Sequence, residues 1–151
     1  SSIAERIFVA RSGEEALDEP EVETGAGLVL IADDNPVNAL IARRALESAG
    51  FIVTVASTGS EAVEMTRKMN PSLILMDLRM PVMDGFEAMR RIRQTGSAVP
   101  IIAVSAEINP AIEREARTAG ANGVASKPLD AEALRALALE WTRAFGEEGA
   151  A

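Results

Sequence analysis

Acidic, hydroxyl and amine side chains stand directly after short apolar runs of this sequence. Asp33 and Asp34 follow LVLIA, and Asp77 follows SLILM. Ser105 follows IIAV, and Lys127 follows GVAS. Each residue taken alone fits an ordinary turn, helix cap or surface position. The repeated placement of reactive side chains at the end of an apolar run instead indicates one shared site.

Three carboxylates gathered in one site would repel each other strongly. At about 4 Å and an effective dielectric constant of about 20, each pair costs about 4 kcal/mol, so we expect a divalent cation to share the site. Oxygen ligands favour Mg²⁺, and the sequence has no EF-hand loop that would favour calcium. The chemistry indicated is phosphoryl transfer, in which Asp77 attacks phosphorus in line while Lys127 and Ser105 hold phosphoryl oxygens.

The segments that must position these residues are of two alternating kinds. Short apolar runs at 28–32, 51–56, 72–76, 99–106 and 122–126 predict strands, and each is followed by an amphipathic stretch that predicts a helix. Continuously apolar strands joined by helices indicate a doubly wound α/β fold, a five-stranded parallel sheet with helices on both faces. In such sheets, ligands bind beyond the carboxyl ends of the strands, where the winding direction reverses.

Cap residues predict where the helices begin and end. A Ser, Thr, Asp or Asn before the first helical turn accepts hydrogen bonds from backbone N–H groups, and Gly or Asn can end a helix in the left-handed conformation. The predicted starts are Asn35, Thr58 with Glu61, Asp84 with Glu87, Asn109 and Asp130, and the predicted ends are Gly50, Asn70, Gly96 and Gly120.

Composition excludes several classes of function. The 151 residues contain no Cys and no His, which excludes thiolate and imidazole metal sites, imidazole general bases and a phosphohistidine within this sequence. A formal net charge of −8 disfavours nonspecific contact with nucleic acid. No apolar run approaches the roughly 18 residues of a membrane span, so we expect a soluble fragment without membrane contact.

The chain is expected to have three parts, and a change in charge near residue 27 marks the first boundary. Residues 1–27 hold seven acidic and two basic residues, and we expect an acidic leader or linker there, or the end of an upstream domain, with IAERIFVA as a short helix or strand. Residues 28–146 form the predicted domain, whose last helix is expected to end near Phe145. Residues 147–151 form a polar tail.

The motifs IADDNPVN, MDLRMPVMDG, AVSA and SKPLD occur together in this order. Through them, residues 28–145 resemble the response-regulator receiver domain of two-component signalling. The resemblance implies a flavodoxin-like strand order, 2-1-3-4-5, and a phosphoryl-accepting function. It implies Asp77 as the phosphoacceptor, with Ser105 and Lys127 binding the phosphoryl group. The implied Mg²⁺ ligands are Asp34, Asp77, Asp33 through a water molecule, and the backbone carbonyl of Arg79.

The resemblance also implies a partner. The phosphoryl donor would be a histidine kinase, or a histidine phosphotransfer protein or domain, since this sequence has no His. DDNPVN is similar to receivers that are attached to hybrid histidine kinases or act in phosphorelays, so a hybrid kinase is one expected parent chain. The domain would be a cytoplasmic module that catalyses its own phosphorylation and dephosphorylation, without an external substrate and without direct contact with nucleic acid.

One departure from the family concerns signal output. Receivers often carry Tyr or Phe three residues before the lysine, and this ring turns inward as the hydroxyl residue approaches the phosphate. Val124 occupies that position, and the chain contains no Tyr. A pseudo-receiver, which docks partners without being phosphorylated, is therefore the alternative function. The family's usual output face is formed by the fourth helix, the fifth strand and the fifth helix.

Two further positions flank the site. Arg79, two residues after Asp77, and Glu107, two residues after Ser105, stand where the family often tunes the lifetime of the phosphate. Their opposite charges predict an ion pair across the site. Arg79 also argues against an aspartyl-phosphate phosphatase, which would carry an acidic residue at that position.

Overall fold

The structure, a computed structural model, describes residues 27–150 and the side chains up to Thr142. The predicted acidic leader, including IAERIFVA, lies outside the described residues apart from Gly27, and so does Ala151. The strands are β1 (Leu28–Ala32), β2 (Ile52–Ala56), β3 (Leu73–Asp77), β4 (Ile101–Ser105) and β5 (Gly123–Ser126). The helices are α1 (Pro36–Ser48), α2 (Gly59–Met69), α3 (Gly85–Gln94), α4 (Pro110–Ala119) and α5 (Ala131–Ala150).

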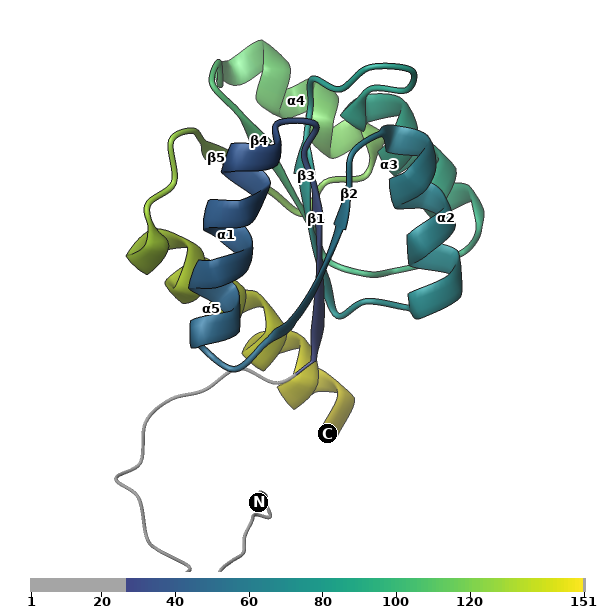
Figure 1. Ribbon diagram of the computed structural model, residues 1–151. Coiled ribbons are helices and arrows are strands. Elements are labelled where there is room, and N and C mark those ends of the chain that lie inside the picture. Colours follow the sequence, from purple (N-terminus) through teal and green to yellow (C-terminus); the bar gives the residue numbers. More distant parts are fainter. Residues whose placement is uncertain (1–26, 151) are drawn as a thin grey trace, which may run out of the picture.

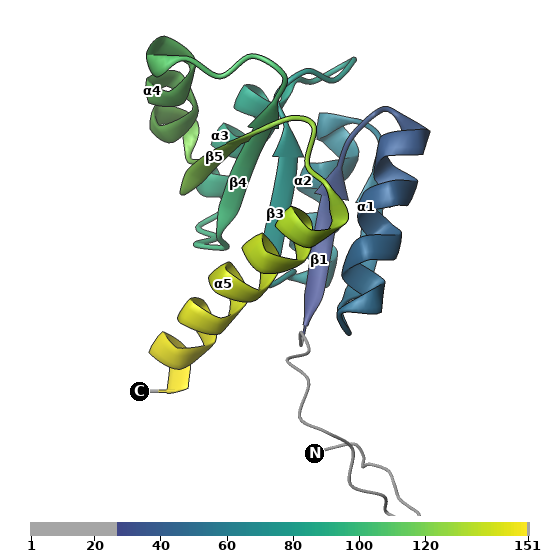
Figure 2. The same ribbon diagram turned by 90° about the vertical axis from the view of Figure 1, so that its left-hand side faces the viewer.

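The five strands form one parallel sheet in the order β2-β1-β3-β4-β5, which confirms the predicted doubly wound fold and strand order. Helices α1 and α5 cover one face, and α2, α3 and α4 cover the other (Figure 1, Figure 2). Within residues 27–150, no helix has the length and apolar character needed to cross a membrane.

Each face of the sheet buries its own apolar cluster. Successive side chains of a strand point to opposite faces, so Val29 and Ile31 of β1 pack with Leu46 of α1 and Leu134 of α5. Leu30, between them in sequence, packs in the second cluster, under α2, α3 and α4. Burial on both sides explains why these strands are continuously apolar rather than alternating. The two clusters hold the strand ends, and hence the polar residues that follow them, at fixed positions.

The predicted helix caps are present. The side chains of Asn35, Thr58, Asp84 and Asn109 each accept a backbone N–H from the first turn of α1, α2, α3 and α4, respectively, and Asp130 accepts the N–H of Ala133 at the start of α5. At the other ends, Gly50, Gly96 and Gly120 have positive φ, and Asn70 has φ 53°. Local sequence therefore sets nearly all the helix boundaries.

The expected end of the last helix was wrong. Helix α5 continues to Ala150 instead of stopping near Phe145. Gly146 and Gly149 interrupt a stretch that otherwise favours helix, and a glycine inside a helix costs only about 1 kcal/mol relative to alanine. The domain limits of 28–146 stay a prediction.

The loop between β3 and α3, which carries Arg79, is held from two sides. The N–H of Gly59, at the start of α2, donates to the carbonyl of Met83 at 3.1 Å, and the N–H of Gly85 donates to the carbonyl of Leu78 at 3.1 Å. At both glycines an added Cβ would overlap a backbone carbonyl oxygen, that of Met83 for Gly59 and that of Asp77 for Gly85. The loop also holds Val82 at φ 72°, a left-handed conformation unusual for a β-branched residue.

We expect Gly59→Ala to lower the free energy of unfolding by about 1–3 kcal/mol, the usual cost of forcing an extra carbon into a packed site. Urea denaturation would measure the change. Ser60→Ala, at the exposed neighbouring position, is the matched control and should stay within about 0.5 kcal/mol of wild type. Equal losses in the two variants would contradict a role for the close approach of Gly59 to Met83.

Candidate functional site

The three carboxylates meet at the carboxyl end of the sheet. Strands β1 and β3 are neighbours, with Ala32 paired to Met76, so Asp33 and Asp77 stand at the same level. Ligand oxygens of Asp33, Asp34 and Asp77 lie within 4.8 Å of one another. Asp33 and Asp77 are 8% and 6% exposed, whereas Asp34 is exposed. The sheet order therefore gathers residues 44 positions apart into one acidic cluster.

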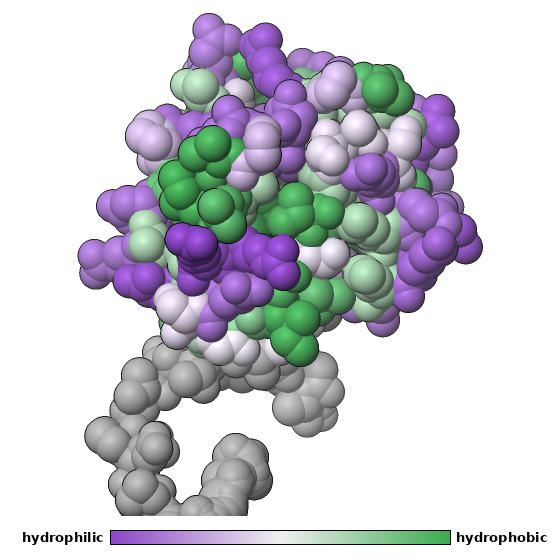
Figure 3. Space-filling view, viewed as in Figure 1, coloured by the Kyte–Doolittle hydropathy of each residue, from purple (hydrophilic) through white to green (hydrophobic). Residues whose placement is uncertain are grey.

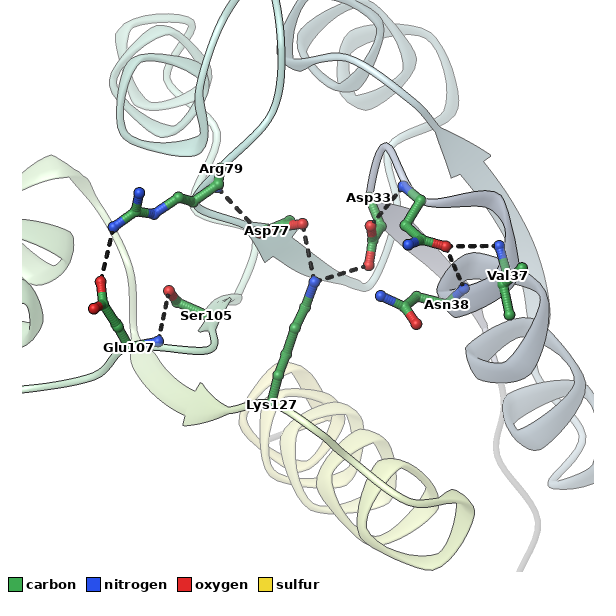
Figure 4. Close-up of polar contacts among 9 residues, drawn as sticks. Asp33, Val37, Asn38, Asp77, Arg79, Ser105, Glu107 and Lys127 are labelled. Carbon is green, nitrogen blue, oxygen red and sulfur yellow. Dashed lines mark hydrogen bonds and ion pairs between the residues drawn. The ribbon is translucent and has the colours of Figure 1, made fainter.

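The ammonium group of Lys127 lies between two of these carboxylates (Figure 4). Its Nζ donates to Oδ2 of Asp77 at 3.0 Å and to Oδ2 of Asp33 at 3.3 Å. Lys127 follows β5, two strands away from β3, and its backbone N–H donates to the carbonyl of Ser105 at the end of β4. This bond fixes the base of the lysine at the sheet edge while its long side chain reaches the carboxylates.

Burial dominates the electrostatics of the phosphoacceptor candidate. It raises the pKa of Asp77, and the hydrogen bonds from Arg79 and Lys127 offset only part of that effect. For Lys127, burial acts to lower the pKa, but the hydrogen bond and charge of Asp77, together with Asp33, outweigh it and the pKa is raised. Lys127 therefore stays charged, and its single positive charge faces more than one carboxylate.

Three side chains at the site share one local device that the sequence analysis missed. Each side-chain oxygen accepts the backbone N–H of the residue two positions later, the turn that Asp and Ser commonly form with their own backbone. These turns could have been predicted from the sequence, because each of the three residues is an Asp or Ser at the end of a strand. The pairs are Asp33 with Asn35 at 2.9 Å, Asp77 with Arg79 at 3.0 Å and Ser105 with Glu107 at 3.2 Å.

Ser105 and Arg79 complete the opposite side of the site. Ser105 is buried at the end of β4, next to Val104, which pairs with Asp77. The N–H of Arg79 orients the Asp77 carboxylate, and the role of the Arg79 carbonyl as a metal ligand stays a prediction. The predicted ion pair is present: Nη2 of Arg79 lies 3.0 Å from Oε1 of Glu107, and both side chains are 71% exposed (Figure 4).

A cavity of about 220 Å³ opens beside the carboxylates on the α1 and α5 side of the sheet. Its walls are mainly aliphatic, and we call it the α1–α5 cavity. The sequence analysis did not predict this cavity, because α1 and α5, which border it, are far apart in the sequence. Its lining includes Ile31, Ile41, Leu75, Val104 and Leu134, with Asn38, Asp77 and Lys127 among the polar residues.

Comparison with protein families and curated proteins gives consistent matches. The family model of the response regulator receiver domain matches residues 29–139. The two-component response regulator ORR41 of Oryza sativa subsp. japonica is 46% identical over 110 residues, covering 70% of this chain and 87% of that protein. The hybrid signal transduction histidine kinase C of Dictyostelium discoideum is 36% identical over 121 residues, covering 75% of this chain but only 10% of that protein.

Solved structures with the same fold are also found. The chemotaxis protein CheY4 of Vibrio cholerae superposes with a TM-score of 0.73 at 30% sequence identity, covering 77% of this chain and 98% of that chain. The receiver domain of the Francisella response regulator 1452 gives a TM-score of 0.74 at 26% identity, covering 79% of this chain and 98% of that chain.

The raised pKa of Asp77 predicts a stability effect in metal-free protein. Just above the ordinary pKa of 3.8, the native state keeps a proton that the unfolded state has lost, so the free energy of unfolding falls as pH rises through this range. Asp77→Asn cannot ionise, and Lys127 keeps Asp33 as a partner. We expect the variant to be more stable than wild type at neutral pH, and about equally stable below pH 3.8.

Urea denaturation in the presence of a chelator would compare the two proteins at both pH values. Asp84→Asn, which changes an exposed cap of α3 to another good cap residue, is the control and should show no such gain. A variant no more stable than wild type at neutral pH would show that burial does not penalise the Asp77 carboxylate.

Proposed function

Because the chain belongs to the response regulator receiver domain family, we propose that it accepts a phosphoryl group on Asp77 from a phosphohistidine of a partner protein or domain. The observation that carries the proposal is the meeting of Asp33, Asp34 and Asp77 within 4.8 Å, with Lys127 bonded to Asp77. Family membership alone gives the fold and the signalling class. The transfer chemistry follows from these side chains.

The donor atoms fit a magnesium ion. They are carboxylate oxygens from three different residues, close enough to share one cation, and Mg²⁺ prefers oxygen ligands. Asp34 and Asp77 would bind it directly, Asp33 through a water molecule, and the Arg79 carbonyl would complete the protein ligands. When bound, Mg²⁺ neutralises carboxylate charge and the charge that develops on the phosphoryl oxygens.

In the transfer, an oxygen of Asp77 attacks phosphorus in line. The new bond joins this oxygen to phosphorus, the phosphorus–nitrogen bond of the phosphohistidine breaks, and the electron pair stays on the imidazole. The ammonium group of Lys127 lies 3.0 Å from Oδ2 of Asp77 before the reaction. During the transfer it donates a hydrogen bond to a phosphoryl oxygen. The Ser105 hydroxyl donates to another. Hydrolysis reverses the modification, because water attacks phosphorus and releases inorganic phosphate and the free carboxylate.

The donor must come from elsewhere, since these 151 residues contain no His. We place its docking surface on α1, where Val37, Leu40 and Ile41 are exposed beside the site, and where Figure 3 shows a hydrophobic area. Ile41 also lines the α1–α5 cavity. The chain spans about a tenth of the hybrid kinases it resembles, so any kinase activity belongs to other parts of such a protein.

The pseudo-receiver alternative has no structural observation in its favour. Its sequence support was Val124, which lies on β5 and is partly buried in the cluster under α4. The acidic cluster, Ser105 and Lys127 are all in place despite this substitution. The departure therefore bears on signal output rather than on the chemistry at Asp77.

We expect incubation with Mg²⁺ and a small acyl phosphate donor to add one phosphoryl group to the protein. Intact mass spectrometry would detect it. Asp77→Asn should remain unmodified because it lacks the nucleophilic oxygen, and Asp84→Asn, at the nearby cap of α3, should be modified like wild type. Modification of the Asp77→Asn protein would contradict the assigned phosphoacceptor.

The ion pair between Arg79 and Glu107 lies beside Asp77, on the side of Ser105 (Figure 4), and we expect it to hinder the attacking water. Arg79→Ala should shorten the half-life of the acyl phosphate by up to about fivefold, since an exposed ion pair is worth about 0–1 kcal/mol. Arg90→Ala, which removes an exposed ion pair with Glu87 on α3, is the control. An unchanged half-life in Arg79→Ala would exclude this role.

A further inference from the structure

A second hollow lies on the other side of the site from the α1–α5 cavity. It has a volume of about 590 Å³ and is bounded by the loop after β3, the start of α3 and one side of α4. We call it the α3–α4 hollow. Figure 2 shows these two helices on the side of the sheet away from α1 and α5. Its lining includes the apolar residues Met80, Phe86 and Ile112 and the polar residues Asp34, Ser105 and Glu115.

The hollow shares walls with the phosphorylation site. Asp34, Arg79 and Ser105 line it, and the same residues surround Asp77. Ser105 is only 3% exposed, and its hydroxyl is held by a long bond of 3.2 Å from the N–H of Glu107. Because Ser105 lines the hollow, a change in the orientation of its hydroxyl would alter the wall of the hollow directly.

Helix α4 is weakly anchored at this hollow. Its buried residues are Ala116 and Ala119, and alanine buries too little apolar surface to hold a helix firmly. Ile112 is the one large apolar side chain in its sequence, and it is partly buried against the cluster that also includes Phe86 and Val124. The contact of Ile112 with its surroundings thus largely determines where α4 rests.

Phe86 is the one aromatic side chain that lines either cavity. It stands at the second position of α3, and it is only partly buried, so the ring can bury more surface by moving inward. Val124 packs in the same cluster without a ring. The aromatic side chain that β5 lacks at this cluster is present on α3.

We propose that Phe86 reads out phosphorylation at the α3–α4 hollow. When Asp77 is phosphorylated and Ser105 turns toward it, the Phe86 ring moves deeper into the hollow, packs on Ile112 and shifts α4. The output surface is then the face formed by α3 and α4, instead of the face of α4, β5 and α5 expected from the family resemblance. This inference rests on the proposed function, because it requires an occupied site at Asp77.

The test places a fluorescent probe at the ring. The chain has a single Trp, at position 141, so a Phe86→Trp, Trp141→Phe double variant has its only indole in the hollow. Adding Mg²⁺ with beryllofluoride, a mimic of the phosphoryl group, should shift the emission to shorter wavelength and reduce quenching by acrylamide. Wild type is the matched control: Trp141, on α5 and packed in the cluster of the opposite face, should keep its emission.

A second variant covers the case in which the Trp replacement disturbs folding. Phe86→Leu keeps an apolar side chain but removes the ring. Beryllofluoride should shift the amide NMR signals of Ile112 and Glu115 in wild type. In Phe86→Leu these two shifts should be lost, while the signals of Asp77 and Ser105 should still shift.

The possible failures are distinguishable. If beryllofluoride does not shift the Asp77 and Ser105 signals of wild type, the proposed function fails, and this inference fails with it. If those signals shift but the α4 signals of Phe86→Leu respond as in wild type, Phe86 is not the readout and the proposed function still stands. An indole at position 86 whose emission stays constant, while the Ser105 signal shifts, would likewise exclude Phe86 as the readout.

Discussion

Mutual repulsion among Asp33, Asp34 and Asp77 is the constraint on which the rest of the site depends. The pairing of β1 with β3 fixes two of these carboxylates at the same level of the sheet and buries them, so they cannot move apart into solvent. One ammonium group, that of Lys127, lies between Asp33 and Asp77. The negative charge that remains makes the cluster a suitable binding place for a divalent cation.

The strands and the short turns after them position the side chains of the site in different ways. The strands bring the Cα atoms together, since their side chains are locked in the two apolar clusters. The turn that each of Asp33, Asp77 and Ser105 forms with the N–H two residues later then orients the side-chain oxygens. The same local turn, repeated after β1, β3 and β4, thus fixes the orientation of three polar side chains at the carboxyl edge of the sheet. This pre-organisation suits a reaction that consists mainly of holding charges in place.

Local features of the chain were predictable, whereas packing between distant segments was not. The helix starts at Asn35 and Asp84 could be predicted because an N-cap depends only on neighbouring residues. The acidic cluster could also be predicted, because the carboxyl ends of parallel strands all lie at one edge of the sheet. The α3–α4 hollow depends on how Phe86 and Ile112, from different helices, fill space together. The end of α5 was misplaced because the polar residues after Phe145 were expected to form a tail, whereas the helix continues through them to Ala150.

Val82 combines an exposed side chain, 87% accessible, with a left-handed backbone, a conformation that costs an L-residue about 1–2 kcal/mol. The loop that carries this strain is fastened by backbone bonds to Gly59 and Gly85. If a cation binds to the Arg79 carbonyl, its binding free energy includes the cost of holding this loop in its strained conformation. A mutation at Gly59, in a helix that supplies none of the three clustered carboxylates, would weaken metal binding by loosening these backbone contacts alone.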